Sequence, residues 1–311
     1  MIKKIYLLAV VVVFTYASAM AVFTADDAGT AGAQFLKIGV DAGAAAMGEA
    51  HAAVSDDPNA IYWNPAGLNK ADGREVSFTH IAWLESISFE HVAYAHPAGF
   101  GTLGISIDYL TAGEIDMYDT YGNDLDDSFK PVDMAVSIGC GREIGGIPAG
   151  LTVKYISRKL EDETATAFAA DLGVLYELEE KNITLGAALQ NLGTKMKFIE
   201  EEEPLPMNIK VGASLLAMES EKGRLLVALD CNASVDNTIR INAGAEYRYS
   251  MKEDLLVTPR AGYKTGNKGL GGLTGISAGV GFLYRKYGLD YAWVPYADLG
   301  QTHRISLSLK F

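Results

Sequence analysis

The sequence is poor in cysteine, in proline and in basic residues. Its 311 residues include two Cys, nine Pro, and 26 Lys and Arg against 39 Asp and Glu. Two cysteines are too few for a disulfide-stapled scaffold or a multi-cysteine zinc module. The net charge of -13 argues against nucleic acid as a partner, because that polyanion needs a basic surface. Hydrophobic residues make up 49% of the chain, which excludes an intrinsically disordered protein.

Long apolar runs are also missing, since no segment approaches the roughly 18 residues of a membrane helix. Residues 1–21 begin with Lys3 and Lys4, continue with an apolar stretch over 5–14, and end in small residues that suit signal peptidase. That stretch is too short to span a bilayer. We therefore predict a cleaved signal peptide over 1–21, with an N-terminal membrane anchor as the alternative. After export, the protein would have to cross a membrane as a closed barrel.

Alternation of apolar and polar residues begins at about residue 75 and continues to the C-terminus. In residues 102–109, for example, Leu103, Ile105 and Ile107 alternate with Gly, Ser and Asp. Successive side chains of a strand point to opposite faces, so each set shares one face. The pattern predicts fourteen strands, to within two, near residues 75–84, 86–96, 101–110, 131–142, 147–159, 165–178, 183–192, 207–217, 224–232, 238–249, 255–264, 273–284, 288–294 and 302–311.

The connections between these segments alternate in length, which favours a transmembrane barrel over a soluble β-sandwich. Short turns alternate with mostly longer connections such as 111–130 and 193–206, as in outer-membrane barrels with short periplasmic turns. Tyr and Trp lie at strand ends on the apolar face, where a membrane interface suits them. We predict an all-β protein, a transmembrane antiparallel barrel of about 14 strands with a short N-terminal plug that contains one or two small helices.

The polar face of the strands carries small residues and charges of both signs, which suits a crowded, hydrated lumen. Cys140 and Cys231 fall on the apolar face of distant strands, so we expect two unpaired thiols facing lipid. The candidate lumen-lining residues are Asp108, Lys154, Arg158, Asp171, Lys210, Asp230, Arg240, Glu246, Arg260, Asp290 and Arg304.

The last strand resembles the assembly signal of bacterial outer-membrane proteins. Its apolar residues alternate and the chain ends in an aromatic ring, at Ile305, Leu307, Leu309 and Phe311. The resemblance implies insertion by the outer-membrane assembly machinery and location in the bacterial outer membrane, with membrane lipid around the barrel at 73–311.

Residues 22–72 have a different composition, rich in Ala, Gly and Asp with few large apolar groups. A barrel of fourteen strands leaves an open lumen unless something fills it, and irregular backbone is tolerated at membrane depth when protein buries it. We predict a plug over 22–72, with an ordinary periplasmic linker as the alternative. Its Pro-punctuated part predicts loop structure, and the motif residues are Asp56, Asp57, Trp63, Asn64, Pro65, Ala66, Gly67 and Leu68.

Catalytic and cofactor motifs are scarce. The chain has no Gly-x-Ser-x-Gly, His-Glu-x-x-His or P-loop pattern, and its five histidines lack metal-ligand spacing. We therefore expect no enzyme activity, no cofactor and no metal site.

The segments 35–40, 47–50 and 55–68 resemble the PorV/PorQ family of outer-membrane proteins, which is similar in turn to FadL-type long-chain fatty acid transporters. The Asn-Pro-Ala-Gly block at 64–67 is the most specific element. The resemblance implies a fourteen-stranded barrel with its N-terminal segment folded into the lumen. Family sequences commonly carry Arg where Gly43 and Ala44 stand here, so an anchoring contact between plug and wall is expected to differ.

Three functions remain open. The first is passive transport of small hydrophobic or amphipathic molecules, with exit through a gap in the wall that Pro259 or Pro131 would create. The second, also implied by the resemblance, is docking of exported proteins in a type IX-like secretion pathway, with 111–130 and 193–206 as the contact surface. The third is a structural outer-membrane protein that transports nothing.

Overall fold

The structure is a computed structural model that describes residues 29–266 and 273–311; the expected signal peptide lies outside them. Fourteen antiparallel strands close into one barrel, so the predicted fold class is confirmed. Each strand pairs with the next barrel strand along the chain, and β1 closes the ring against β18. The barrel strands are β1 (Glu75–Ala82), β2 (Ser88–Ala98), β3 (Gly101–Thr111), β6 (Val132–Ile144), β7 (Ile147–Leu160), β8 (Glu163–Leu178), β9 (Ile183–Gly193), β12 (Asn208–Glu219), β13 (Gly223–Ser234), β14 (Arg240–Lys252), β15 (Leu255–Lys264), β16 (Ile276–Tyr284), β17 (Tyr287–Pro295) and β18 (Gln301–Lys310).

The alternating sequence separates an apolar outer face from a polar inner face. On β3, Ile105 is 44% exposed on the outside, whereas Ser106 is 3% exposed on the inside. Tyr155, Tyr263 and Tyr291 are likewise exposed on the outer face. Among the described residues, no helix is both long and apolar enough to cross a bilayer.

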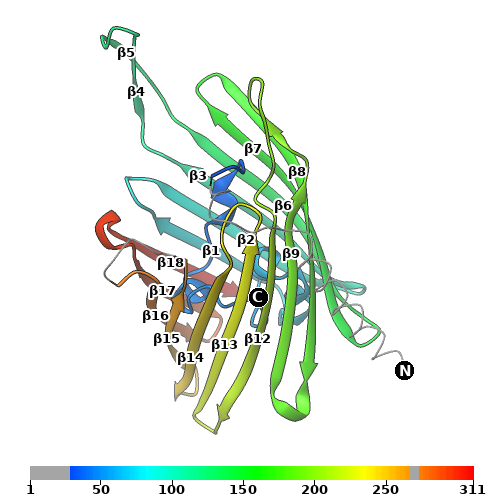
Figure 1. Cartoon of the computed structure of the whole chain (residues 1–311). Helices are drawn as coiled ribbons and strands as arrows, with labels where there is room; N and C mark the ends of the chain where they lie inside the picture. The colour runs from blue at the N-terminus through cyan, green and yellow to red at the C-terminus, as the bar shows by residue number, and fades with distance from the viewer. Residues whose placement is uncertain (1–28, 267–272) are drawn as a thin grey trace.

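Two small hairpins lie in the longer connections, where the sequence predicted no strands. One pairs β4 (Ile115–Tyr118) with β5 (Asp124–Phe129) and stands well clear of the barrel (Figure 1). The other pairs β10 (Met196–Lys197) with β11 (Glu202–Glu203). Both lie at the end opposite the C-terminus, which we take as the outer end because outer-membrane barrels carry their longer loops there.

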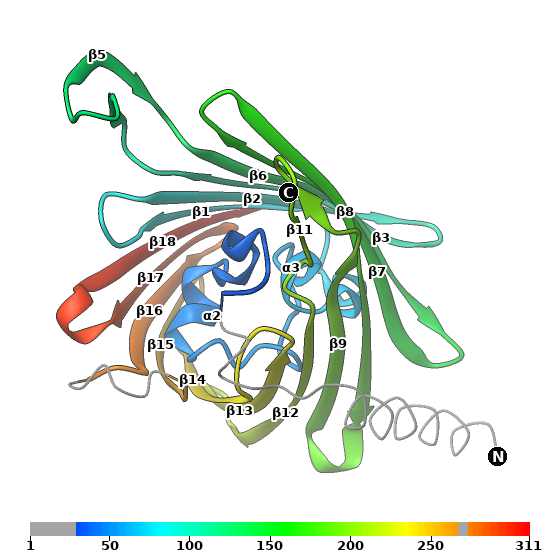
Figure 2. The same ribbon diagram turned by 45° about the horizontal axis from the view of Figure 1, so that its top comes forward.

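Four short helices lie inside the ring of strands rather than on its surface (Figure 2). They are η2 (Gln34–Lys37), α2 (Ala42–Ala46), α3 (Ala60–Trp63) and η3 (Pro65–Lys70). The first two correspond to the one or two small helices expected in the plug. The Pro-punctuated stretch predicted as loop forms the other two, because a proline is tolerated in the first turn of a helix. Outside the ring, η4 (Glu179–Lys181) and η5 (Ala297–Leu299) belong to turns.

Candidate functional site: the filled lumen

Residues 29–72, called the lumenal segment below, pack against the inner wall of the barrel. Ala42, Ala46 and Leu68 are fully buried there. The segment is too small and irregular to satisfy its own backbone, so wall side chains do so. The Ala42 amide donates to Ser306 Oγ (2.8 Å), and Asp230 Oδ2 accepts from the amides of His51 and Ala52 (2.7 and 2.8 Å).

Asn64 ties the Pro-containing helix η3 to both the segment and the wall. Its Nδ2 donates to the carbonyl of Ala52 (2.7 Å) and to that of Val174 on β8 (3.2 Å). Its Oδ1 accepts from the Ala66 amide (3.2 Å) and so caps η3, where Pro65 begins the helix. The side chain is fully buried, which explains why the motif needs Asn at this position.

Glycines on the inner wall let the backbone of the lumenal segment approach closely. A Cβ atom at Gly262 on β15 would lie 2.0 Å from the Gly48 nitrogen and 2.2 Å from the Met47 carbonyl carbon. A Cβ atom at Gly173 on β8 would lie 2.0 Å from Asn64 Oδ1. Real side chains do not fit at such distances, so the wall and the segment are shaped to one another at these positions.

A charged contact fixes the middle of the lumenal segment. Glu49 Oε1 accepts from Lys264 Nζ on β15 (2.9 Å) and lies 3.8 Å from Arg304 Nη2 on β18. Arg304 also donates to the carbonyl of Gly39 (2.5 Å) and is fully buried. Because a buried charge is costly unless it is paired, these groups hold one another in place.

Aromatic rings of the segment lie beside wall lysines. Lys210 Nζ on β12 sits 4.2 Å from the centre of the Trp63 ring, a cation–π contact. Trp63 Nε1 donates to the carbonyl of Val40 (3.2 Å). On β7, Lys154 Nζ pairs with Asp171 Oδ2 (2.6 Å), whose other oxygen accepts from the Asn191 amide (2.7 Å).

Arg260 on β15 occupies space that Gly43 leaves free. Its Nη1 is 3.3 Å from the position a Cβ atom of Gly43 would take. Its Nε donates to Glu246 Oε2 (2.6 Å), and its Nη1 donates to Asp290 Oδ1. Family sequences commonly carry an arginine where Gly43 and Ala44 stand in this chain. Here the guanidinium of Arg260, a wall residue, lies beside Gly43 instead.

The remaining lumen-lining candidates also point inward. His91 Nδ1 contacts Asp108 Oδ1 (2.5 Å), and Arg158 Nε pairs with Asp133 (2.8 Å). Arg240 lies beside Gly266. Other inward residues were not singled out from the sequence although they share the same alternating face, notably Gln190, Asn242, Lys264 and Ser277, which contact the lumenal segment.

The outer end of the lumenal segment is tied to the loop between β13 and β14. Asp236 in that loop accepts from Gln34 Nε2 (2.7 Å) and Lys37 Nζ (2.9 Å), and from Ser234 Oγ (2.5 Å). Burial favours the protonated carboxyl, but the hydrogen bonds from Ser234, Gln34 and Lys37 outweigh it and lower the pKa of Asp236. The clamp therefore requires an ionised carboxylate.

An apolar layer lies just beneath this clamp. Phe35 and Leu36 are buried in one cluster with the inward residues Ile81, Phe89 and Ile156 of the wall. Part of the lumen wall toward the outer end is therefore apolar, and the lumenal segment itself covers that part.

The other predicted residues lie apart from these contacts. Asp57 accepts from the amide of Asn59 (2.9 Å), and Asp56 is exposed. Cys140 and Cys231 are free. Within residues 29–266 and 273–311, no three His, Cys, Asp or Glu side chains gather as a metal site. The C-terminal residues Ile305, Leu307, Leu309 and Phe311 follow the outer face of β18 to the end of the chain.

The two prolines considered for a wall gap have different surroundings. At Pro259 the ladder between β14 and β15 is interrupted: pairing stops at Glu246↔Arg260 and resumes at Tyr249↔Val257. The reason is that Pro has no amide to donate. Pro131 precedes β6, whose ladder with β3 is continuous from Thr111↔Val132 to Thr102↔Gly141.

The fold is that of outer-membrane FadL-type transporters. The toluene transporter TbuX of Ralstonia pickettii superposes with a TM-score of 0.60 at 15% identity, covering 88% of this chain and 98% of that one. The toluene transporter TodX of P. putida gives 0.60 at 12% identity, with 88% and 99% covered. A FadL homologue of Pseudomonas aeruginosa gives 0.52 at 9% identity, with 88% and 98% covered.

The protein is thus an outer-membrane β-barrel with a FadL-like fold. The family described as Type IX secretion system protein PorV matches residues 23–238, and the chain belongs to this family. The resemblance drawn from the Asn-Pro-Ala-Gly region is confirmed. A comparison with curated proteins finds no match.

Proposed function

We propose that this barrel serves a type IX secretion pathway by docking exported proteins at the outer surface. The observation that carries the proposal is the β4–β5 hairpin, which stands clear of the barrel (Figure 1). It exposes Tyr121 (90%), Tyr118 and Leu125. Apolar groups grouped in this way on a solvent-exposed element are typical of an interaction surface.

The filled lumen supports the same proposal. The lumenal segment bonds to side chains and to a backbone carbonyl on several wall strands, and it packs against wall glycines without space for a side chain. A barrel closed in this way suits a surface platform better than an open pore. On this proposal the protein has no catalytic activity and needs no cofactor.

The hairpin also carries several acidic residues, which make the proposed docking surface negatively charged. Asp116, Asp124, Asp126 and Asp127 lie on β4 and β5, and Asp119 on the turn between them. Complementary charge steers association and disfavours wrong partners. A partner segment with apolar and basic side chains is therefore expected to fit this hairpin.

The experiment deletes the gene in its own host and restores it as the wild type, as a Tyr118→Ser/Tyr121→Ser variant or as a Phe100→Ser control. Phe100 is also exposed, but it lies in a short turn at the opposite end of the barrel. We expect the deletion and the hairpin variant both to leave exported proteins in the periplasm, while the control secretes normally. Normal secretion by the hairpin variant, or by the deletion strain, would refute the proposal.

Passive transport of small hydrophobic molecules is the second candidate. It is favoured by the apolar lining of the outer lumen at Ile81, Phe89 and Ile156 and by the interrupted ladder at Pro259. Its test is uptake of a labelled long-chain fatty acid or toluene by liposomes that contain the protein. Uptake above that of empty liposomes, lost when the lumenal segment is cross-linked to the wall, would support transport. Uptake equal to that of empty liposomes would refute it.

A further inference from the structure

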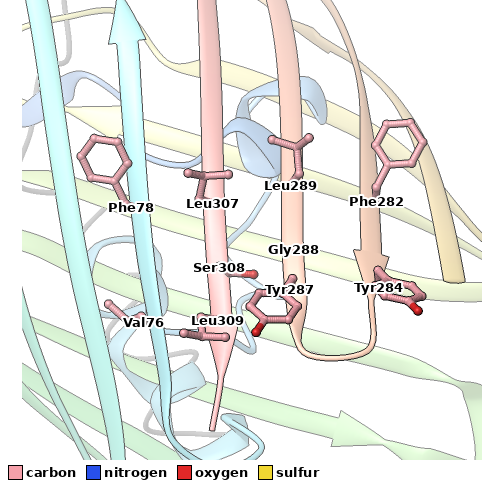
Figure 3. A pocket seen from close by; sticks show the side chains of 10 residues that line it. All are labelled: Val76, Phe78, Phe282, Tyr284, Tyr287, Gly288, Leu289, Leu307, Ser308 and Leu309. Atoms are coloured by element: carbon pink, nitrogen blue, oxygen red, sulfur yellow. The ribbon is translucent and has the colours of Figure 1, made fainter. Parts of the chain in front are cut away.

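The outer face of the barrel has a trough near its C-terminal end. It encloses about 490 Å³ and is lined by outward residues of β1, β16, β17 and β18 (Figure 3). Phe78 and Phe282 flank it, and Leu307 and Leu289 lie between them in one continuous row of paired residues. The flanking strands β1 and β16 are three strand spacings apart, about 14 Å. The trough is therefore wide enough to hold the acyl chains of a lipid.

The trough leads to a polar edge at the turn between β16 and β17. A second row continues it toward the turn and contains the paired residues Tyr284 and Tyr287 (Figure 3). Tyrosine combines an apolar ring with a hydroxyl group and suits the boundary between hydrocarbon and headgroups. The trough therefore ends at the depth where a phospholipid changes from acyl chain to headgroup.

Basic side chains lie over the rings of Tyr284 and Tyr287. Arg285 lies with its guanidinium carbon 5.4 Å from the centre of the Tyr284 ring, and Lys286 Nζ lies 5.6 Å from that of Tyr287. Arg285 pairs with Asp254 (3.0 Å), whereas no carboxylate pairs with Lys286 in the part of the chain that the structure describes. The Lys310 amide donates to the Lys286 carbonyl (3.0 Å), but Lys310 Nζ pairs with Glu75 (3.8 Å), so Lys286 is the cation at this edge for which the described residues supply no carboxylate.

We propose that this trough binds one anionic phospholipid of the periplasmic leaflet, with its acyl chains between Phe78 and Phe282 and its phosphate at Lys286. The bilayer supplies such a lipid at this depth, and the charge at the edge selects an anionic headgroup. Arg285 already pairs with Asp254, so Lys286 supplies the positive charge that a lipid phosphate would pair with. The site lies on the outside of the wall and does not depend on the proposed function.

The test is native mass spectrometry of the purified, detergent-solubilised protein with phosphatidylglycerol or phosphatidylcholine of identical acyl chains. The headgroup variant is Lys286→Ala, matched by Lys222→Ala in the turn between β12 and β13. The trough variant is Leu289→Trp, matched by Leu229→Trp on the outer face of β13. Gel mobility with and without boiling checks that each variant forms a barrel, and the two test variants probe the site independently.

We expect the wild-type protein and both controls to retain one phosphatidylglycerol under conditions that remove phosphatidylcholine. Lys286→Ala and Leu289→Trp should each reduce the retained fraction at least threefold. Equal retention of the two lipids, or equal loss from the test variants and their matched controls, would overturn the proposal.

Discussion

Substitution of one wall glycine tests whether the lumenal segment is held by close contact with the barrel. In Gly262→Ala, the new methyl group would lie 2.0 Å from the Gly48 nitrogen, with backbone rather than a flexible side chain in its way. Overpacking of this kind costs about 1–3 kcal/mol. The Gly48 amide also donates to Ser277 Oγ (3.0 Å), and its carbonyl accepts from Asn242 (2.7 Å). Losing both bonds adds roughly 2 kcal/mol.

The expected total cost is about 3–5 kcal/mol. It should weaken the docking of the lumenal segment and not the strand β15, because neighbouring strands hold β15 in place. A change of about 3 kcal/mol corresponds to roughly a hundredfold increase in the open fraction. Hydrogen exchange at Gly48, His51 and Ala52 should accelerate by that factor, while exchange in β7 stays unchanged. The control is Gly99→Ala, where a Cβ atom meets nothing within 4 Å. Unchanged exchange at Gly48 in Gly262→Ala would refute the close-contact argument.

Three further predictions concern other parts of the molecule. Asn64→Ala removes two buried hydrogen bonds and one part-buried hydrogen bond. It should lower the stability of the folded protein by about 2–4 kcal/mol, measured as the denaturant midpoint, and an unchanged midpoint would contradict the role of the cap. The lowered pKa of Asp236 means that its clamp stabilises the fold above the usual carboxyl range and loses that contribution as pH falls through the lowered pKa. The protection factors at Gln34–Lys37, which are corrected for the intrinsic pH dependence of amide exchange, should therefore fall in acid in the wild type. Asp236→Asn should show low protection factors at every pH, and identical pH profiles of the two proteins would count against the clamp. Deletion of Phe311 should reduce the heat-shifted barrel recovered from outer membranes severalfold, and full recovery would argue against an assembly signal.

The barrel was predictable because each strand carries its own signal. Alternation such as that of Leu103, Ile105 and Ile107 needs only local sequence, and it holds wherever one face meets lipid and the other does not. The fourteen segments expected from this pattern match the barrel strands within a few residues. The same alternation identified the inward charges, because side-chain direction follows position along a strand.

The contacts inside the lumen were not predictable by the same means. Glu49 pairs with Lys264, 215 positions away, and Asn64 bonds to Val174, 110 positions away. No local periodicity encodes such pairs. The helices α3 and η3 were missed because the prolines around them read as loop signals, whereas Pro65 serves as the first residue of a helix capped by Asn64. The outer hairpins were missed because their strands are short and exposed.

The central claim is that the lumenal segment lies inside the closed barrel, and an engineered disulfide tests it most directly. A Cβ atom at Gly212 on β12 would lie 3.2 Å from Ala52 Cβ, close to the separation that a disulfide needs. A Cβ atom at Gly212 would also collide with the Asp230 carboxylate, so the background carries Asp230→Ala together with Cys140→Ala and Cys231→Ala. In this background, the pair Ala52→Cys with Gly212→Cys should cross-link on mild oxidation in intact outer membranes. The control pairs Ala52→Cys with Ala213→Cys, whose side chain points to the opposite face of β12, and should not cross-link. A heat-shifted barrel in which neither pair forms a disulfide would contradict the account.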